Sequence, residues 1–149
     1  MKKYVLDSDI LTYLEQQDSP SHGKVRQRLS QLHDDDEVMI SILSLYEMHY
    51  GLSWASDDER SALSRTVDSI ASKFIVVGLS QSGAMIFGDL KAAYRRTIGI
   101  APDALKRNDI DLLIASTALA QDAVLVSNDR LFEKIKDINP NFQLENWAA

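Results

Sequence analysis

The stretch that constrains the fold most is YVLDSDIL, residues Tyr4 to Leu11. Three apolar or aromatic residues lead directly into Asp7, and after Asp9 apolar residues recur at helical spacing. This pattern predicts a short buried strand over 3–7, followed by a helix to about residue 17. A carboxylate at such a turn costs free energy to bury unless a cation or hydrogen bonds compensate it. The chain must therefore supply something that compensates Asp7.

Strand and helix patterns alternate along the rest of the chain. Apolar, β-branched runs predict further strands at 38–41, 74–77 and 123–126, with a fifth, edge strand at 142–144. Helical spacing fills the intervals, ending at about residues 33, 55, 98 and 121, with a short helix through 131–135. Alternating strands and helices pair the strands in parallel and cover both faces of the sheet. We therefore expect a single domain over residues 1–149, an α/β three-layer sandwich around four or five short strands.

Composition excludes several classes of protein. The chain has no cysteine, so a disulfide framework, a thiolate zinc site and a cysteine nucleophile are all ruled out. No apolar run is long enough for a membrane span, and the apolar run at the N-terminus is too short for a signal peptide. We expect a cytoplasmic protein. The net charge of −6 argues against a general nucleic-acid binder.

One segment departs from this acidic balance. Within 91–107 the only acid is Asp103, and the segment carries five basic residues: Lys91, Arg95, Arg96, Lys106 and Arg107. Such a run is commonly a solvated helix face and loop. The functional alternative is a phosphate-binding rim beside an acidic centre.

Four acids stand at the ends of predicted elements or in apolar stretches: Asp7, Glu47, Asp111 and Asp129. Asp7 and Asp129 follow parallel strands, so both lie at the edge of the sheet where ligands bind. The helix of Glu47 directly follows a strand, whereas that of Asp111 precedes one, which makes its place at this edge less secure. Carboxylates alone suit Mg²⁺ or Mn²⁺. These ions lower the pKa of bound water and neutralise charge on a phosphate during hydrolysis.

Each acid also has a purely structural alternative. Asp7 and Asp129 could cap the helices that follow them. Ser44-x-x-Glu47 has the spacing of a capping box, and Asn108-x-x-Asp111 has the same spacing. Asp109 and Asp111 point to nearly opposite sides of a helix, so only one of them reaches a common site. We assign Asp111 to the site, Asp109 to the first turn of its helix, and Trp54 and Trp147 to a core or an interface.

In chain order, YVLDSDIL, ISILSLYEMHYG, NDIDLLIASTAL and AVLVSNDRLF resemble the motifs of the PIN domain family. The resemblance is closest to the VapC-type toxins of bacterial toxin–antitoxin pairs and covers nearly the whole chain. It implies that the family's four acids fall on Asp7, Glu47, Asp111 and Asp129. It also implies that Ser127 occupies a Ser or Thr position that assists the site. Asp9 replaces the usual Asn and becomes a helix-start residue that adds charge at the rim.

The resemblance implies an endoribonuclease that depends on Mg²⁺ or Mn²⁺ and leaves 3′-hydroxyl and 5′-phosphate ends. It further implies a homodimer held inactive by a cognate VapB-type antitoxin. Two other interpretations stay open. Asp7-x-Asp9 after a strand also resembles the start of haloacid-dehalogenase-type phosphatases, although Leu11 stands where those enzymes have Thr or Val. The chain could also be a non-catalytic PIN-like module that binds RNA or protein.

Overall fold

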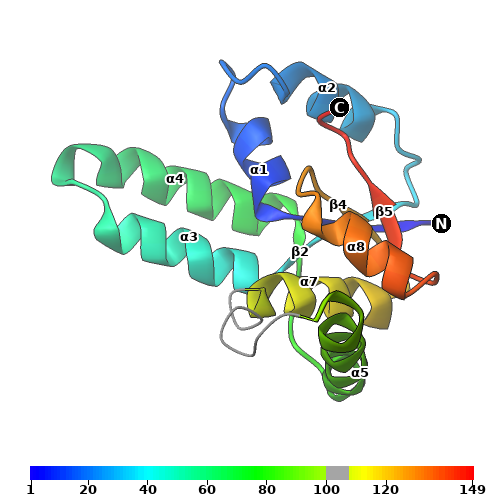
Figure 1. Cartoon of the computed structure of the whole chain (residues 1–149). Helices are drawn as coiled ribbons and strands as arrows, with labels where there is room; N and C mark the ends of the chain where they lie inside the picture. Colours follow the sequence, from blue (N-terminus) through cyan, green and yellow to red (C-terminus); the bar gives the residue numbers. More distant parts are fainter. Residues whose placement is uncertain (100–107) are drawn as a thin grey trace.

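The computed structural model describes residues 1–99 and 108–149, and within them five parallel strands form one sheet. The strand order is β3–β2–β1–β4–β5, so the chain crosses between neighbours through helices (Figure 1). The strands are β1 (Lys3–Leu6), β2 (Glu37–Ser41), β3 (Ile75–Val77), β4 (Val124–Val126) and β5 (Gln143–Glu145). The predicted α/β architecture is confirmed, and β5 is the parallel edge strand expected near residue 142.

The helices agree with the predicted ones, except at the end of the second. They are α1 (Ser8–Glu15), α2 (His22–Ser30), α3 (Ile42–Trp54), α4 (Asp57–Lys73), α5 (Gln81–Ile98), α7 (Asp109–Ala120) and α8 (Leu131–Ile138). We expected α2 to reach about His33. It ends at Ser30 because the next two amides bond three residues back: Gln31 N–H donates to Arg28, and Leu32 N–H donates to Leu29.

The sheet is buried on both faces, which explains why the first strand does not alternate between apolar and polar residues. Val5 packs into a core with residues of α5, α7 and α8. Tyr4 and Leu6 point the other way, into a second core with residues of α1, α2 and α4. The chain therefore forms the three layers that its strand and helix pattern predicts.

The α3–α4 hairpin extends beyond the sheet (Figure 1). Trp54, the last residue of α3, is 83% exposed, so its predicted place in the core is wrong and only an interface role is left. Trp147 is buried, and its ring packs at a tilt against that of Tyr4 with 5.3 Å between centroids, as expected of a core residue. None of the helices in the described ranges is long and apolar enough to cross a membrane.

Strand register brings three chain segments to one edge of the sheet. Leu6, the last residue of β1, pairs with Ile40 on one side and with Val126 on the other. The residues that follow, Asp7 and Ser127 among them, therefore leave the sheet side by side at its carboxyl edge. This is the edge at which open parallel sheets bind ligands.

Candidate active site

Asp7 lies at the centre of this edge and is only 7% exposed. It is the N-cap residue of α1, and its Oδ1 accepts a hydrogen bond of 2.9 Å from the backbone N–H of Ser8. Its Oδ2 accepts one of 2.8 Å from the Ser127 hydroxyl. Burial, and after it the charge of Asp9, nevertheless raise the pKa of Asp7 from 3.8 to about 7. The two hydrogen bonds therefore leave the buried charge undercompensated.

Asp9 does more than start a helix at the rim of the site. Its carboxylate accepts the backbone N–H of Ile10 at 2.7 Å and, through Oδ2, the backbone N–H of Asn128 at 2.9 Å. Burial raises the pKa of Asp9 despite these bonds. The side chain thus ties the turn after β1 to the loop after β4, two segments that lie far apart in the sequence.

Ser127 connects the carboxylates of that loop. While its hydroxyl donates to Asp7, its oxygen accepts the backbone N–H of Asp129 at 3.0 Å. Asp129 Oδ1 in turn accepts the backbone N–H of Leu131, the first residue of α8, at 3.0 Å, although the N-cap residue of that helix is Arg130 and not Asp129. This bond uses one oxygen of the carboxylate and leaves the other available for a second role.

Asp111 lies within the electrostatic field of the other acids. Burial, followed by the charges of Asp129, Glu47 and Asp9, raises the pKa of Asp111 to about 6. The sequence left its place at this edge insecure because α7 precedes a strand. The structure places it close enough to the other acids for their charges to disfavour its ionisation.

Neither predicted capping box forms. Ser41 is the N-cap of α3, and its hydroxyl accepts the backbone N–H of Leu43 at 3.1 Å, because β2 runs directly into the helix. Ser44 therefore lies inside the helix, and Glu47 has no cap to complete. Asn108 is the N-cap of α7 but makes no side-chain capping bond. These findings remove the structural alternatives for Glu47 and Asp111.

The predicted basic residues fall into three groups. Lys91 Nζ lies 2.8 Å from Oδ1 of Asp109, so Asp109 serves the first turn of α7 as expected and Lys91 is already paired. Arg95 and Arg96 are exposed in the last turn of α5. Lys106 and Arg107 lie outside the described residues.

Sequence reasoning missed three residues of this edge. The Ser8 hydroxyl lies near both Ser44 and Glu47. Asn128 links the loop after β4 to α1, since its amide nitrogen donates to the Tyr13 hydroxyl at 3.2 Å. In the sequence, Ser8 and Asn128 stand out only by their position beside acids, and Ser44 only by its capping-box spacing to Glu47.

The donor chemistry of this edge fits a hard divalent cation, because every candidate ligand is a carboxylate oxygen. Burial and, after it, the repulsion between carboxylates raise the pKa values of Asp7 and Asp111, and a bound cation would compensate both effects. Across residues 1–99 and 108–149, no three His, Asp or Glu side chains lie close enough to hold one ion together. To share a cation, the carboxylates would have to turn toward one another.

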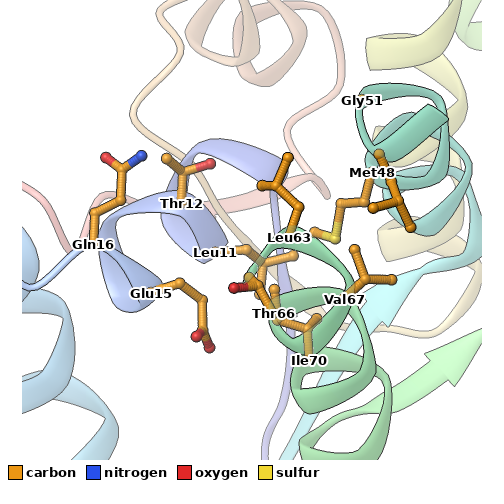
Figure 2. A pocket seen from close by; sticks show the side chains of 11 residues that line it. Leu11, Thr12, Glu15, Gln16, Met48, Gly51, Leu63, Thr66, Val67 and Ile70 are labelled. Carbon is orange, nitrogen blue, oxygen red and sulfur yellow. The ribbon is translucent and has the colours of Figure 1, made fainter. Parts of the chain in front are cut away.

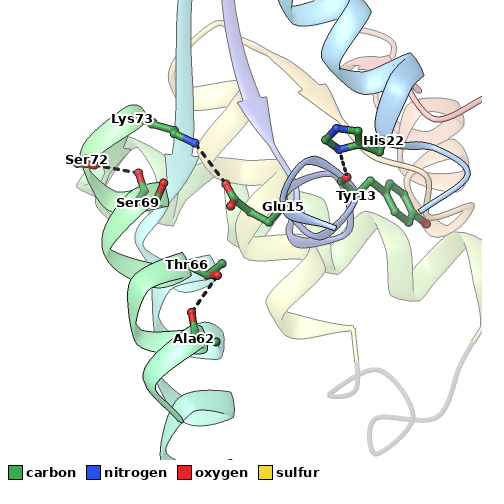
Figure 3. A network of polar contacts seen from close by, with 8 residues as sticks. All are labelled: Tyr13, Glu15, His22, Ala62, Thr66, Ser69, Ser72 and Lys73. Carbon is green, nitrogen blue, oxygen red and sulfur yellow. Dashed lines mark hydrogen bonds and ion pairs between the residues drawn. The ribbon is translucent and has the colours of Figure 1, made fainter. Parts of the chain in front are cut away.

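A separate apolar cavity of about 300 Å³ opens between α1, α3 and α4 (Figure 2). Leu11, Met48, Leu63 and Val67 line it, and Gly51 stands on the α3 side. None of the four acids reaches it. Glu15, which also lines the cavity, pairs with Lys73 at 3.7 Å (Figure 3). Nearby, the His22 Nδ1–H group donates a hydrogen bond to the Tyr13 carbonyl.

The sequence matches the PIN domain family over residues 4–138, so the chain belongs to that family. It is similar to ribonuclease VapC2 of Rickettsia felis, with 29% identity over 145 residues, 97% of each chain.

Solved structures agree with this assignment. The fold resembles VapBC2 from Rickettsia felis bound to a DNA fragment from their promoter, with a TM-score of 0.78, 28% identity and coverage of 97% of this chain and 98% of the other. It also resembles VapBC-1 from nontypeable Haemophilus influenzae, with a TM-score of 0.77 and 99% coverage of both chains. Since identity to the latter is 23%, that likeness concerns the fold alone.

Proposed function

We propose that this chain is a metal-dependent endoribonuclease and the toxin of a toxin–antitoxin pair. The observation that carries the proposal is the buried Asp7, whose pKa is raised to about 7 at the carboxyl edge of a PIN-family sheet. Such a carboxylate is best explained by a cation that compensates it. The similarity to a ribonuclease VapC2 supports RNA as the substrate.

Asp7, Glu47, Asp111 and Asp129 would hold Mg²⁺ or Mn²⁺. When bound, the cation would lower the pKa of a water molecule and neutralise charge on the phosphodiester. The remaining side chains act on the carboxylates. Ser127 orients Asp7 and the backbone of Asp129. Asp9 holds the loop after β4, which carries Ser127 and Asp129. The expected products have 3′-hydroxyl and 5′-phosphate ends.

The RNA backbone would be contacted by the basic residues of 91–107. Arg95 and Arg96 are exposed and carry most of this role among the described residues. Lys106 and Arg107 extend the same segment. The Lys91 ammonium contributes less, because its charge is already paired with Asp109.

The protein partner would be a VapB-type antitoxin, as in the complexes that the chain resembles. The apolar cavity between α1, α3 and α4 suits an apolar segment of such a protein (Figure 2). An antitoxin Arg could pair with the carboxylates at the sheet edge. We also propose that the chain forms a homodimer through the exposed aromatic residues of α3 and acts in the cytoplasm.

The purified chain should cleave a structured RNA in Mg²⁺ or Mn²⁺ and lose this activity in EDTA. Asp7→Asn and Asp111→Asn should each lower the cleavage rate about 100-fold or more, because a catalytic cation contributes several kcal/mol. Asp68→Asn, an exposed acid on α4, is the matched control and should cleave like wild type.

Full activity in both site variants would overturn the proposal. Turnover of phosphomonoesters without RNA cleavage would instead indicate a phosphatase, and binding of RNA without cleavage would indicate a non-catalytic module.

A further inference from the structure

We propose that Ser8 and Ser44 are positioning residues that hold Glu47 at the acidic edge of the sheet. The inference rests on the proposed function, since it assigns the contact that aims one of the metal-binding carboxylates. The sequence offered Ser44 and Glu47 as a capping box, whereas in the structure Ser41 caps α3 and Ser44 contacts α1 instead.

A short chain of polar atoms joins α1 to α3. The Ser8 hydroxyl oxygen lies 3.2 Å from Ser44 Oγ and 3.4 Å from Glu47 Oε1. Ser8 directly follows Asp7, while Ser44 and Glu47 lie three residues apart and so on one face of α3. The three side chains therefore meet where the first turn of α1 passes α3, next to the carboxylate at the centre of the site.

The burial of Ser44 shows that its hydroxyl has no solvent to bind. Its exposed fraction is 0%, and a buried hydroxyl without a partner is costly. Two buried hydroxyls of α7 bond within their own helix: Ser116 donates to Leu112, and Thr117 donates to Leu113. The bond at Ser44 crosses to α1 instead. It therefore fixes one helix against the other.

The contact with Ser8 restricts the orientation of the Glu47 side chain. It is an exposed carboxylate on a flexible side chain, and ordering such a side chain costs about 1.5–2 kcal/mol of rotamer entropy. Ser8 is the donor in both contacts, so its one proton serves Ser44 and Glu47 in turn. When the proton lies on the Glu47 side, the bond holds that carboxylate beside the first turn of α1 before a cation arrives.

Three variants test this with two measurements, Mn²⁺ affinity by electron paramagnetic resonance and RNA cleavage. Ser8→Ala and Ser44→Ala should each weaken Mn²⁺ binding and cleavage about 10-fold, the usual loss when a partner of a metal ligand is removed. Ser8→Thr keeps the hydroxyl and should retain both. Ser72→Ala is the control, since that hydroxyl bonds only its own helix α4 (Figure 3).

A double-mutant cycle with Glu47→Gln separates positioning from packing. If Ser8 acts through Glu47, Ser8→Ala should add no further loss of Mn²⁺ affinity in the Glu47→Gln background. Additive losses, or wild-type Mn²⁺ affinity in Ser8→Ala, would overturn the inference. Because the double-mutant cycle measures Mn²⁺ affinity, it tests the positioning role even if RNA is not the substrate. A wild-type chain that binds Mn²⁺ but does not cleave RNA would refute the proposed function and leave the positioning role intact.

Discussion

Asp7 couples the stability of the metal-free protein to pH. Its pKa of 3.8 rises to about 7 on folding, so the folded chain holds a proton that the unfolded chain releases. The stabilising effect of this proton is complete below pH 4 and is lost as pH rises to about 7. Without metal, unfolding by urea should therefore become easier across this window, by a few kcal/mol at most. Asp7→Asn should flatten the profile and be more stable than wild type at pH 8.

The matched control for this measurement is again Asp68→Asn, which should keep the wild-type slope. Wild-type and Asp7→Asn chains that lose stability in parallel, in EDTA, would contradict the assignment. In the Asp7→Asn chain the new amide oxygen can still accept the backbone N–H of Ser8, and the Ser127 hydroxyl can rotate to accept from the amide nitrogen. The helix cap therefore survives the substitution.

At the scale of elements, the first turn of α7 is held by an ion pair instead of a side-chain cap. Lys91 of α5 pairs with Asp109, two residues before Asp111, with both side chains about 30% exposed. Breaking this pair with Lys91→Met or Asp109→Asn should destabilise the chain by about 0.5–1 kcal/mol. Both variants should also lower RNA cleavage to a similar extent. Exchanging the two residues, Lys91→Asp with Asp109→Lys, should restore much of the loss.

A direct RNA contact by Lys91 gives a different pattern. Lys91→Met would then reduce the salt dependence of RNA binding by about one unit of slope, and Asp109→Asn would leave binding unchanged. The exchange would restore nothing. Arg95→Met provides the comparison, since this residue is exposed at the end of the same helix.

Periodicity was enough to predict most elements, because local spacing determines which residues a helix or strand can bury. It predicted the first strand, the long helix ending at Ile98 and even the edge strand β5. It favoured a start of α3 near Ile42, which is confirmed, but it did not exclude a cap at Ser44, because helical spacing also follows that residue. Only the direct passage from β2 into the helix selects Ser41.

The contacts between residues of the site could not be predicted from the sequence. Asp9 and Asn128 are 119 residues apart, and Ser8 and Ser44 are 36 residues apart. No local pattern encodes such pairs. They follow from the register that places the ends of β1, β2 and β4 together.

At the scale of the whole molecule, two apolar surfaces are uncovered within residues 1–99 and 108–149, and their shapes suit different partners. The cavity between α1, α3 and α4 is concave. The stripe of Tyr46, Tyr50 and Trp54 repeats every four residues on the outer face of α3 and is exposed. Acids begin α4 beside the end of this stripe, which disfavours RNA there. A helix face of this kind can pair with the same face of a second copy about a twofold axis.

Two variants separate these surfaces. Gly51→Gln adds a side chain at the rim of the cavity, where a Cβ meets no atom within 4 Å, so the fold should tolerate it. It should weaken binding of the cognate antitoxin, and leave the mass measured by light scattering at that of a dimer. Tyr50→Ser with Trp54→Ser should do the reverse, giving monomers that still bind that protein.

The matched control for the cavity variant is Gly88→Gln, an equally open position within α5. Both substitutions replace a poor helix former, so each should stabilise its helix by about 0.5–1 kcal/mol. Any effect specific to Gly51→Gln therefore comes from the obstructed cavity and not from helix stability. A Gly51→Gln chain that binds the antitoxin like wild type would place the antitoxin elsewhere. An unchanged dimer mass in the stripe variant would rule out α3 as the twofold interface.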